Sequence, residues 1–174
     1  MAIASTNYSS VSASVAIPIT LASLATSATM AGGRQSDIVT NVTNKYLDCL
    51  VTGQITTGTT PTTGKTIAVY VYVPLSVTAS TFVYPKAGAT ALGEVDAAAT
   101  FDAEQRRGGL IYAGANAVNS SSDRAYSFSF SVAELVGYMP LTWGLFVTHD
   151  TGVNLNATAG NHWFHYVGLK ADVT

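Results

Sequence analysis

Strict alternation of apolar and polar side chains is the feature that most limits what this chain can fold into. Between Ala125 and Val132, apolar residues occupy every second position, and serine or alanine fills most positions between them. Thr66–Val73 alternates in a similar way, with β-branched residues on one face. Successive side chains of a strand point to opposite faces of a sheet, so a period of two predicts strands.

Further segments are predicted as strands because they are rich in β-branched or aromatic residues. They are Lys45–Ile55, Gly109–Ala113, Thr142–His149 and His162–Leu169. The connections between them contain Gly, Pro, Asn and Thr, which suits turns. The whole pattern predicts an all-β fold, an antiparallel β-sandwich or jelly roll. Short helical connectors are expected at 97–106 and at 131–137, where Ser131 and Gly137 stand at capping positions.

The first part of the chain is expected to be an extended N-terminal arm, residues 1–36, in front of a β-domain at 37–174. Residues 1–33 contain no Asp, Glu, Lys, Arg or His. A Ser/Thr/Ala-rich run buries too little apolar surface to order itself, so we expect it to dock on another subunit. Alternating apolar residues favour a docked strand over a helix. The expected anchors are Val11, Val15, Ile17, Ile19, Leu21 and Leu24.

The composition of the 174 residues favours packed assembly. Charged residues make up 10%, below the ~25% of an average soluble domain, and the net charge is -2. Copies with such a surface repel one another weakly. Nucleic acid is not an expected partner, because binding to phosphates needs clustered Lys and Arg. The sequence comes closest to such a cluster at Arg106 and Arg107, which are interpreted as a solvated turn. Neither an export signal nor a membrane span is expected.

Three patterns resemble reactive or ligand-binding sites and are interpreted as structural. Cys49 is the single cysteine, which excludes an internal disulfide, and we expect a buried, inert thiol. The stretch 58–66 has five residues between its glycines and precedes a strand, so it is predicted to be a long hairpin loop and not a phosphate loop. His162 and His165 lie three apart on a predicted strand and so face opposite ways, which is poor geometry for sharing a metal ion with His149.

No catalytic grouping is evident, and no enzyme activity, cofactor or metal is predicted. Serines are abundant, but a G-x-S-x-G nucleophile elbow is missing. Asp96, Asp102 and Glu104 fall in a Gly/Ala-rich stretch that we expect to be exposed, where nothing would raise a carboxyl pKa. Sugar rings stack on exposed aromatic side chains, so a glycan-binding face remains an alternative hypothesis. Its candidate residues are Tyr70, Tyr72, Trp163 and Tyr166.

Two stretches of the chain carry a resemblance to a known class of proteins. The first is Leu24–Asp48 (LATSATMAGGRQSDIVTNVTNKYLD), followed by the loop Thr57–Lys65 (TGTTPTTGK). The second is Leu141–Asn156 (LTWGLFVTHDTGVNLN) with Gly160–Trp163 (GNHW). Together they cover about half of the chain, and they resemble small virion structural proteins of tailed bacteriophages.

The resemblance implies an auxiliary capsid component, a decoration or cement protein that bridges neighbouring shell subunits. It would be made in the host cytoplasm and would sit on the capsid exterior, with the major capsid protein and copies of itself as partners. Within the virion, a tail or neck component remains the alternative, as a tube, adaptor or fibre-attachment subunit. A receptor- or glycan-binding module is the alternative from another class. The resemblance supplies no catalytic residues.

Overall fold

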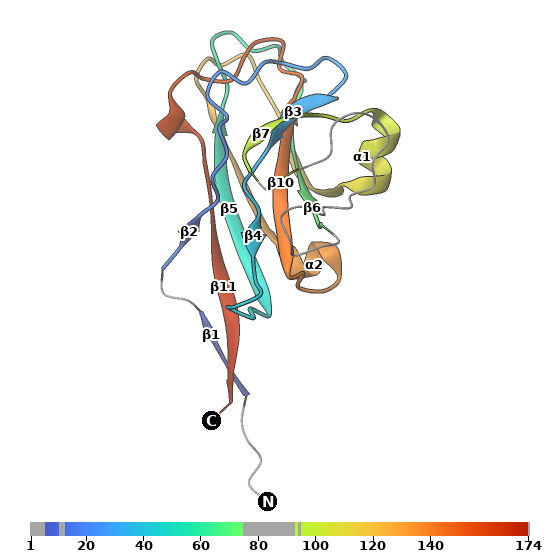
Figure 1. Ribbon diagram of the computed structural model, residues 1–174. Helices are drawn as coiled ribbons and strands as arrows, with labels where there is room; N and C mark the ends of the chain where they lie inside the picture. The colour runs from blue at the N-terminus through green and yellow to red at the C-terminus, as the bar shows by residue number, and fades with distance from the viewer. Residues whose placement is uncertain (1–5, 11–12, 75–92, 94, 174) are drawn as a thin grey trace, which may run out of the picture.

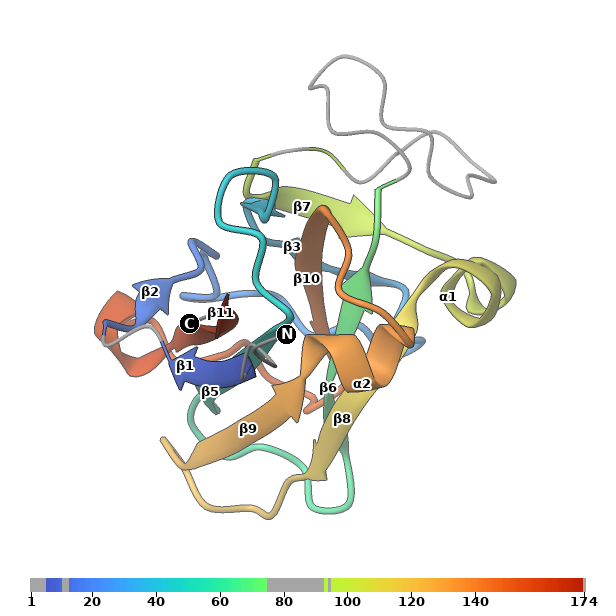
Figure 2. The same cartoon turned by 90° about the horizontal axis from the view of Figure 1, so that it is seen from below.

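The strands form two antiparallel sheets that pack face to face. The computed structural model describes residues 6–10, 13–74, 93 and 95–173. Within these residues the strands are joined by irregular loops, two short helices and one 3-10 turn (Figure 1). Seen along the strands, the two sheets lie on opposite sides of a common core (Figure 2). The predicted all-β sandwich is confirmed.

The first sheet has the strand order β1-β11-β5-β9, and β2 also pairs with β11. Its strands are β1 (Thr6–Ser10), β2 (Val15–Ala16), β5 (Asp48–Thr56), β9 (Ala125–Ser131) and β11 (Trp163–Val173). The second sheet has the order β7-β3-β10-β6-β8, and β4 pairs with β10. Its strands are β3 (Gly32–Gln35), β4 (Val39–Thr40), β6 (Thr66–Tyr72), β7 (Ala97–Thr100), β8 (Ile111–Ala117) and β10 (Thr142–His149).

Alternate residues of the central strands fill the core between the sheets. Val69 on β6, Leu145 on β10 and Val51 on β5 are fully buried there. On β10 the outward residues are buried as well, because a second apolar cluster covers the outer face of the second sheet. In that cluster the rings of Phe101 and Phe146 lie 5.0 Å apart. This is why β10 has no exposed face, although antiparallel sheets often leave one face in water.

The two helices are α1 (Ala103–Gly109) and α2 (Val132–Val136), and the 3-10 turn is η1 (Ala159–Asn161). The connector predicted at 131–137 is confirmed: the Ser131 hydroxyl accepts a hydrogen bond from the Glu134 N–H, and Gly137 ends the helix at φ 87°. The connector predicted at 97–106 is partly wrong, because its first four residues form β7. Asp102 caps α1 through a reciprocal pair of hydrogen bonds with Gln105, so the helix begins only after it.

The loop between β5 and β6 joins the two sheets. β5 pairs with β11 and β9, whereas β6 pairs with β10 and β8. The hairpin predicted for residues 58–66 is therefore wrong. A turn-rich composition predicts a connection, but strand pairing depends on which sheet each strand completes around the core, and this is a non-local property.

Candidate functional sites

Most of the predicted docking arm is part of the sandwich. Ile17 and Leu21 are 3% and 1% exposed and belong to the main core. Ile19 and Leu24 are partly buried and pack against the same core, and Val15 remains 40% exposed. Val11 lies outside the described residues.

The expected boundary at residue 36 does not mark the edge of a separate arm. β3 (Gly32–Gln35) lies inside the second sheet, between β10 and β7. Before it, the Ile17 N–H donates a hydrogen bond to the carbonyl of Phe164 on β11 (2.8 Å). Ile17 and Leu21 therefore fill the chain's own core and are not available to a neighbouring subunit in this structure.

β1 and the end of β11 extend away from the body of the sandwich. β1 pairs with residues 169–173 of β11, whereas β5 pairs with residues 163–169 of the same strand. After Leu169, β11 therefore keeps β1 on one side and has no described strand on the other. This two-stranded ribbon, residues 6–10 with 170–173, projects from the sandwich and carries both ends of the chain (Figure 1). The docked strand is predicted around Val15–Leu21, where only Val15–Ala16 forms a strand, and its partner is the chain's own β11.

The two buried histidines each donate a hydrogen bond to a backbone carbonyl. His162 Nε2 donates to the Asn156 carbonyl (2.8 Å), and its Nδ1 accepts the Thr56 N–H (3.3 Å). His149 Nε2 donates to the Leu24 carbonyl (3.1 Å). Burial lowers the pKa of both imidazoles. His165 lies on β11, with its ring 5.5 Å from that of Trp163. Among the described residues, no three His, Cys, Asp or Glu side chains gather as a metal site would require.

The remaining reactive groups have structural contacts. Burial, followed by the nearby charge of Asp48, raises the pKa of the Cys49 thiol to about 12. Burial also raises the pKa of Asp96, but hydrogen bonds from Arg34 (2.5 Å) and Thr20 outweigh it, and the net shift is downward. These contacts hold the segment before β7 against the second sheet. Asp102 caps α1, as described above.

The aromatic residues proposed for sugar stacking separate into buried and accessible ones. Tyr72 and Tyr166 are 1% and 6% exposed, so their ring faces are not open to a ligand. Trp163 is 38% exposed on the first sheet. Tyr70 is partly exposed on the second sheet, where its ring meets that of Tyr112 edge to face at 5.7 Å. The rings of Tyr70 and Tyr112 line a pocket.

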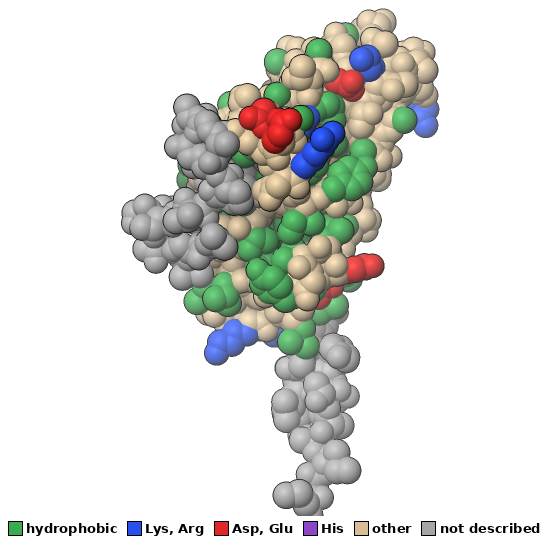
Figure 3. Space-filling model, turned by 90° about the vertical axis from the view of Figure 1, so that its right-hand side faces the viewer, with side chains coloured by type: hydrophobic (Ala, Val, Ile, Leu, Met, Phe, Trp, Pro, Cys, Tyr) green, Lys and Arg blue, Asp and Glu red, His purple; other side chains and the backbone are tan. Residues whose placement is uncertain are grey.

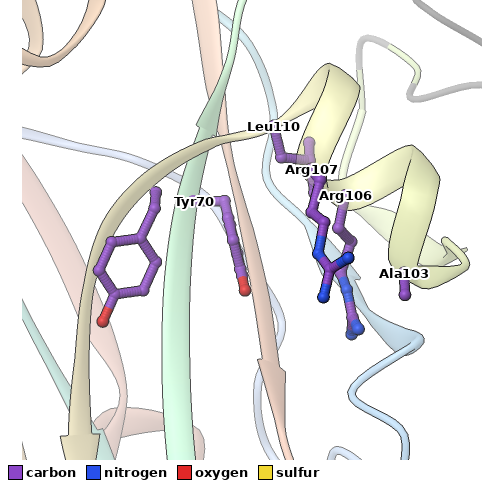
Figure 4. A pocket seen from close by; sticks show the side chains of 6 residues that line it. Tyr70, Ala103, Arg106, Arg107 and Leu110 are labelled. Atoms are coloured by element: carbon purple, nitrogen blue, oxygen red, sulfur yellow. The ribbon is translucent and has the colours of Figure 1, made fainter.

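The pocket lies where α1 approaches β6 and β8 and has a volume of about 360 Å³. Its lining residues are Tyr70, Ala103, Arg106, Arg107, Leu110 and Tyr112. Tyr70 and the guanidinium groups of Arg106 and Arg107 point to the same side (Figure 4). On the face that carries α1, basic side chains lie beside hydrophobic ones, and acidic side chains lie next to them (Figure 3).

Sequence reasoning missed this pocket because its two halves come from different elements. The solvated turn predicted at Arg106 and Arg107 is wrong, because both residues lie in the last turn of α1, and Tyr112 is not among the predicted aromatic candidates. Alternation on Thr66–Val73 does place Tyr70 on the face opposite the main core. The position of α1 against that face depends on the contact between Phe101 and Phe146, which no local pattern reveals.

The fold and these sites define the protein as an all-β sandwich with a strand ribbon at its chain ends and a cationic, aromatic pocket on one face. Comparison with known proteins finds no matching family model, no matching curated protein and no matching solved structure. No helix within the described residues is long and apolar enough to cross a membrane.

Proposed function

We propose that this chain is a non-enzymatic structural subunit of a phage particle, a decoration protein attached to the capsid exterior by its β1–β11 ribbon. The proposal rests on the pairing of β11. Up to Leu169 this strand pairs with β5, and from Leu169 onward it pairs with β1. Beyond that residue the ribbon has two strands, and an isolated two-stranded ribbon is marginally stable in water. A third strand from a neighbouring protein would complete it.

Strand addition suits the chemistry of this segment. An unpaired strand edge offers backbone N–H and C=O groups in a row, and a partner strand binds by continuing the ladder. The first 33 residues contain no charged side chain, so a partner that pairs with β1 meets no fixed charge there. The expected occupant is a strand of the major capsid protein.

The test removes β1 without touching the core. A chain that lacks residues 1–10 keeps Ile17 and Leu21, which are core residues, so its urea midpoint should match that of the full chain. Mixed with undecorated shells, the truncated protein should show at least a tenfold loss of occupancy. Truncated protein that occupies shells fully would contradict attachment through the ribbon.

Imaging of particles separates the decoration role from the tail alternative. Many copies at icosahedral positions support decoration of the shell. A single small ring on the tail axis supports a tail or neck component and would overturn the capsid assignment, while leaving strand addition by the ribbon as a testable mode of attachment.

A further inference from the structure

The pocket between α1 and the second sheet offers a binding function separate from attachment. We propose that it binds a carboxylate-bearing sugar, such as a glucuronate unit, between its arginines and its tyrosines. The proposal rests on the residues that line the pocket, and it does not depend on the role of the ribbon.

The arginine side of the pocket has one fixed guanidinium and one that is open. Arg106 Nη1 donates to the carbonyls of Thr29 (3.0 Å) and Met30, which holds its side chain in place. Arg107 is exposed and forms no hydrogen bond or ion pair with another described residue. The guanidinium of Arg107 is therefore free to form a bidentate pair with a ligand carboxylate.

No acidic side chain lines the pocket to neutralise these arginines. Two acidic residues precede these arginines in the sequence. Asp102 accepts the Gln105 N–H at 2.8 Å as the cap of α1, and Glu104, in the first turn of α1, forms no ion pair with another described residue. An incoming carboxylate therefore meets positive charge without a competing carboxylate in the lining. This favours an acidic ligand over a neutral one.

The tyrosine side of the pocket consists of two rings set at a steep angle to each other. Tyr112 is 56% exposed and stands edge to face against Tyr70. Tyr70 in turn packs on the buried Phe146 ring, with centroids 6.3 Å apart. Tyrosine combines an apolar ring with a polar tip, and a pyranose combines an apolar C–H face with hydroxyl groups. The volume of about 360 Å³ is at the lower end of the range for small-ligand pockets.

Other ligand classes fit this surface less well. An inorganic anion would use the arginines and leave the two tyrosine rings without a role. A peptide strand would need the free edge of β8, but the Asn116 side-chain amide donates to the Ser127 carbonyl (3.0 Å) and ties that edge to β9. A compact ring with one carboxylate uses both sides of the pocket.

The experiment titrates the full chain with glucuronate, glucose and inorganic phosphate, and follows binding by NMR chemical shifts. We expect saturable binding of glucuronate that is at least tenfold tighter than that of glucose. One added hydrogen bond between charged groups increases the affinity by about that factor. Arg107→Gln should remove this preference, and Tyr112→Ala should weaken the binding of glucuronate. Both positions are exposed, so both variants should unfold at the same urea concentration as the unchanged chain.

Arg124→Gln is the matched control, because Arg124 lies over the Tyr126 ring at 5.7 Å and outside the pocket. It should leave the affinity for glucuronate unchanged. Three results would overturn the proposal: equal affinity for glucose and glucuronate, phosphate binding as tight as glucuronate binding and insensitive to Tyr112→Ala, or no saturable binding of any of the three compounds. Failure of ribbon attachment to shells would leave this proposal unaffected.

Discussion

Replacing Leu21 by alanine tests whether the N-terminal segment belongs to the chain's own core. Leu21 is 1% exposed, and the change removes three buried carbon atoms. At about 0.8 kcal/mol for each buried methylene, the transfer cost is roughly 2.4 kcal/mol. The cavity left behind raises the expected loss in free energy of unfolding to about 3–4 kcal/mol. A domain of ordinary stability, 5–15 kcal/mol, would lose a large share.

Urea denaturation followed by tryptophan fluorescence measures this loss, since Trp143 is fully buried in the same core. With a slope of about 2 kcal/mol per molar urea, the midpoint should fall by roughly 1.5–2 M. Val15→Ala is the matched control, because Val15 is 40% exposed, and its effect should stay within about 0.5 kcal/mol. If both variants unfold at the same urea concentration, Leu21 is not in this core and the reasoning fails.

Three further predictions follow from buried groups. His149 and His162 have folded-state pKa values below the ordinary 6.5, so stability is full above that pH and should decline below it as the unfolded chain takes up protons. Urea midpoints measured at pH 7.5 and at pH 5 should show this decline, and His162→Gln should make the decline smaller. If the unchanged chain and the variant lose equal stability between these two pH values, the inference that His162 is uncharged in the folded protein is wrong. A methyl group at Gly144 would overlap a buried tyrosine ring, so Gly144→Ala should cost about 1–3 kcal/mol, whereas Gly160→Ala, which meets no atom within 4 Å, should cost far less. Cys49 should resist a thiol reagent in the native protein and react in urea, and rapid native labelling would show that the thiol is not buried.

Local pattern predicts the longer strands well, because a strand with one buried face shows a period of two in its sequence. It misses the short strands β3, β4 and β7. Thr142–His149 is predicted with the same bounds that β10 has, and Ala125–Val132 exceeds β9 by one residue. The loop at 58–66 shows the limit of this reasoning. Its composition predicts a turn, but the choice between a hairpin and a crossing to the other sheet is made by the core as a whole.

The same limit explains the errors at the N-terminus and in the pocket. A segment without charge, such as residues 15–24, is equally suited to a neighbour's surface and to its own core, and the sequence does not say which surface is closer. Burial of Ile17 and Leu21 depends on the distant strand β11, to which Ile17 is hydrogen bonded. The pocket likewise needs α1 to pack over β6, a contact between residues more than thirty positions apart in the sequence.

The placement of both chain ends on one ribbon has a practical meaning for engineering. β5 begins at Asp48, opposite Leu169 and next to the ribbon, and runs away from it towards Trp163. The Thr57–Lys65 loop that follows β5 therefore lies at the opposite end of the sandwich from the ribbon (Figure 1). A peptide fused to either terminus would crowd the surface that we propose for attachment. A peptide inserted in the 57–65 loop would point away from it, which makes that loop the position for displaying foreign sequences on an assembled particle.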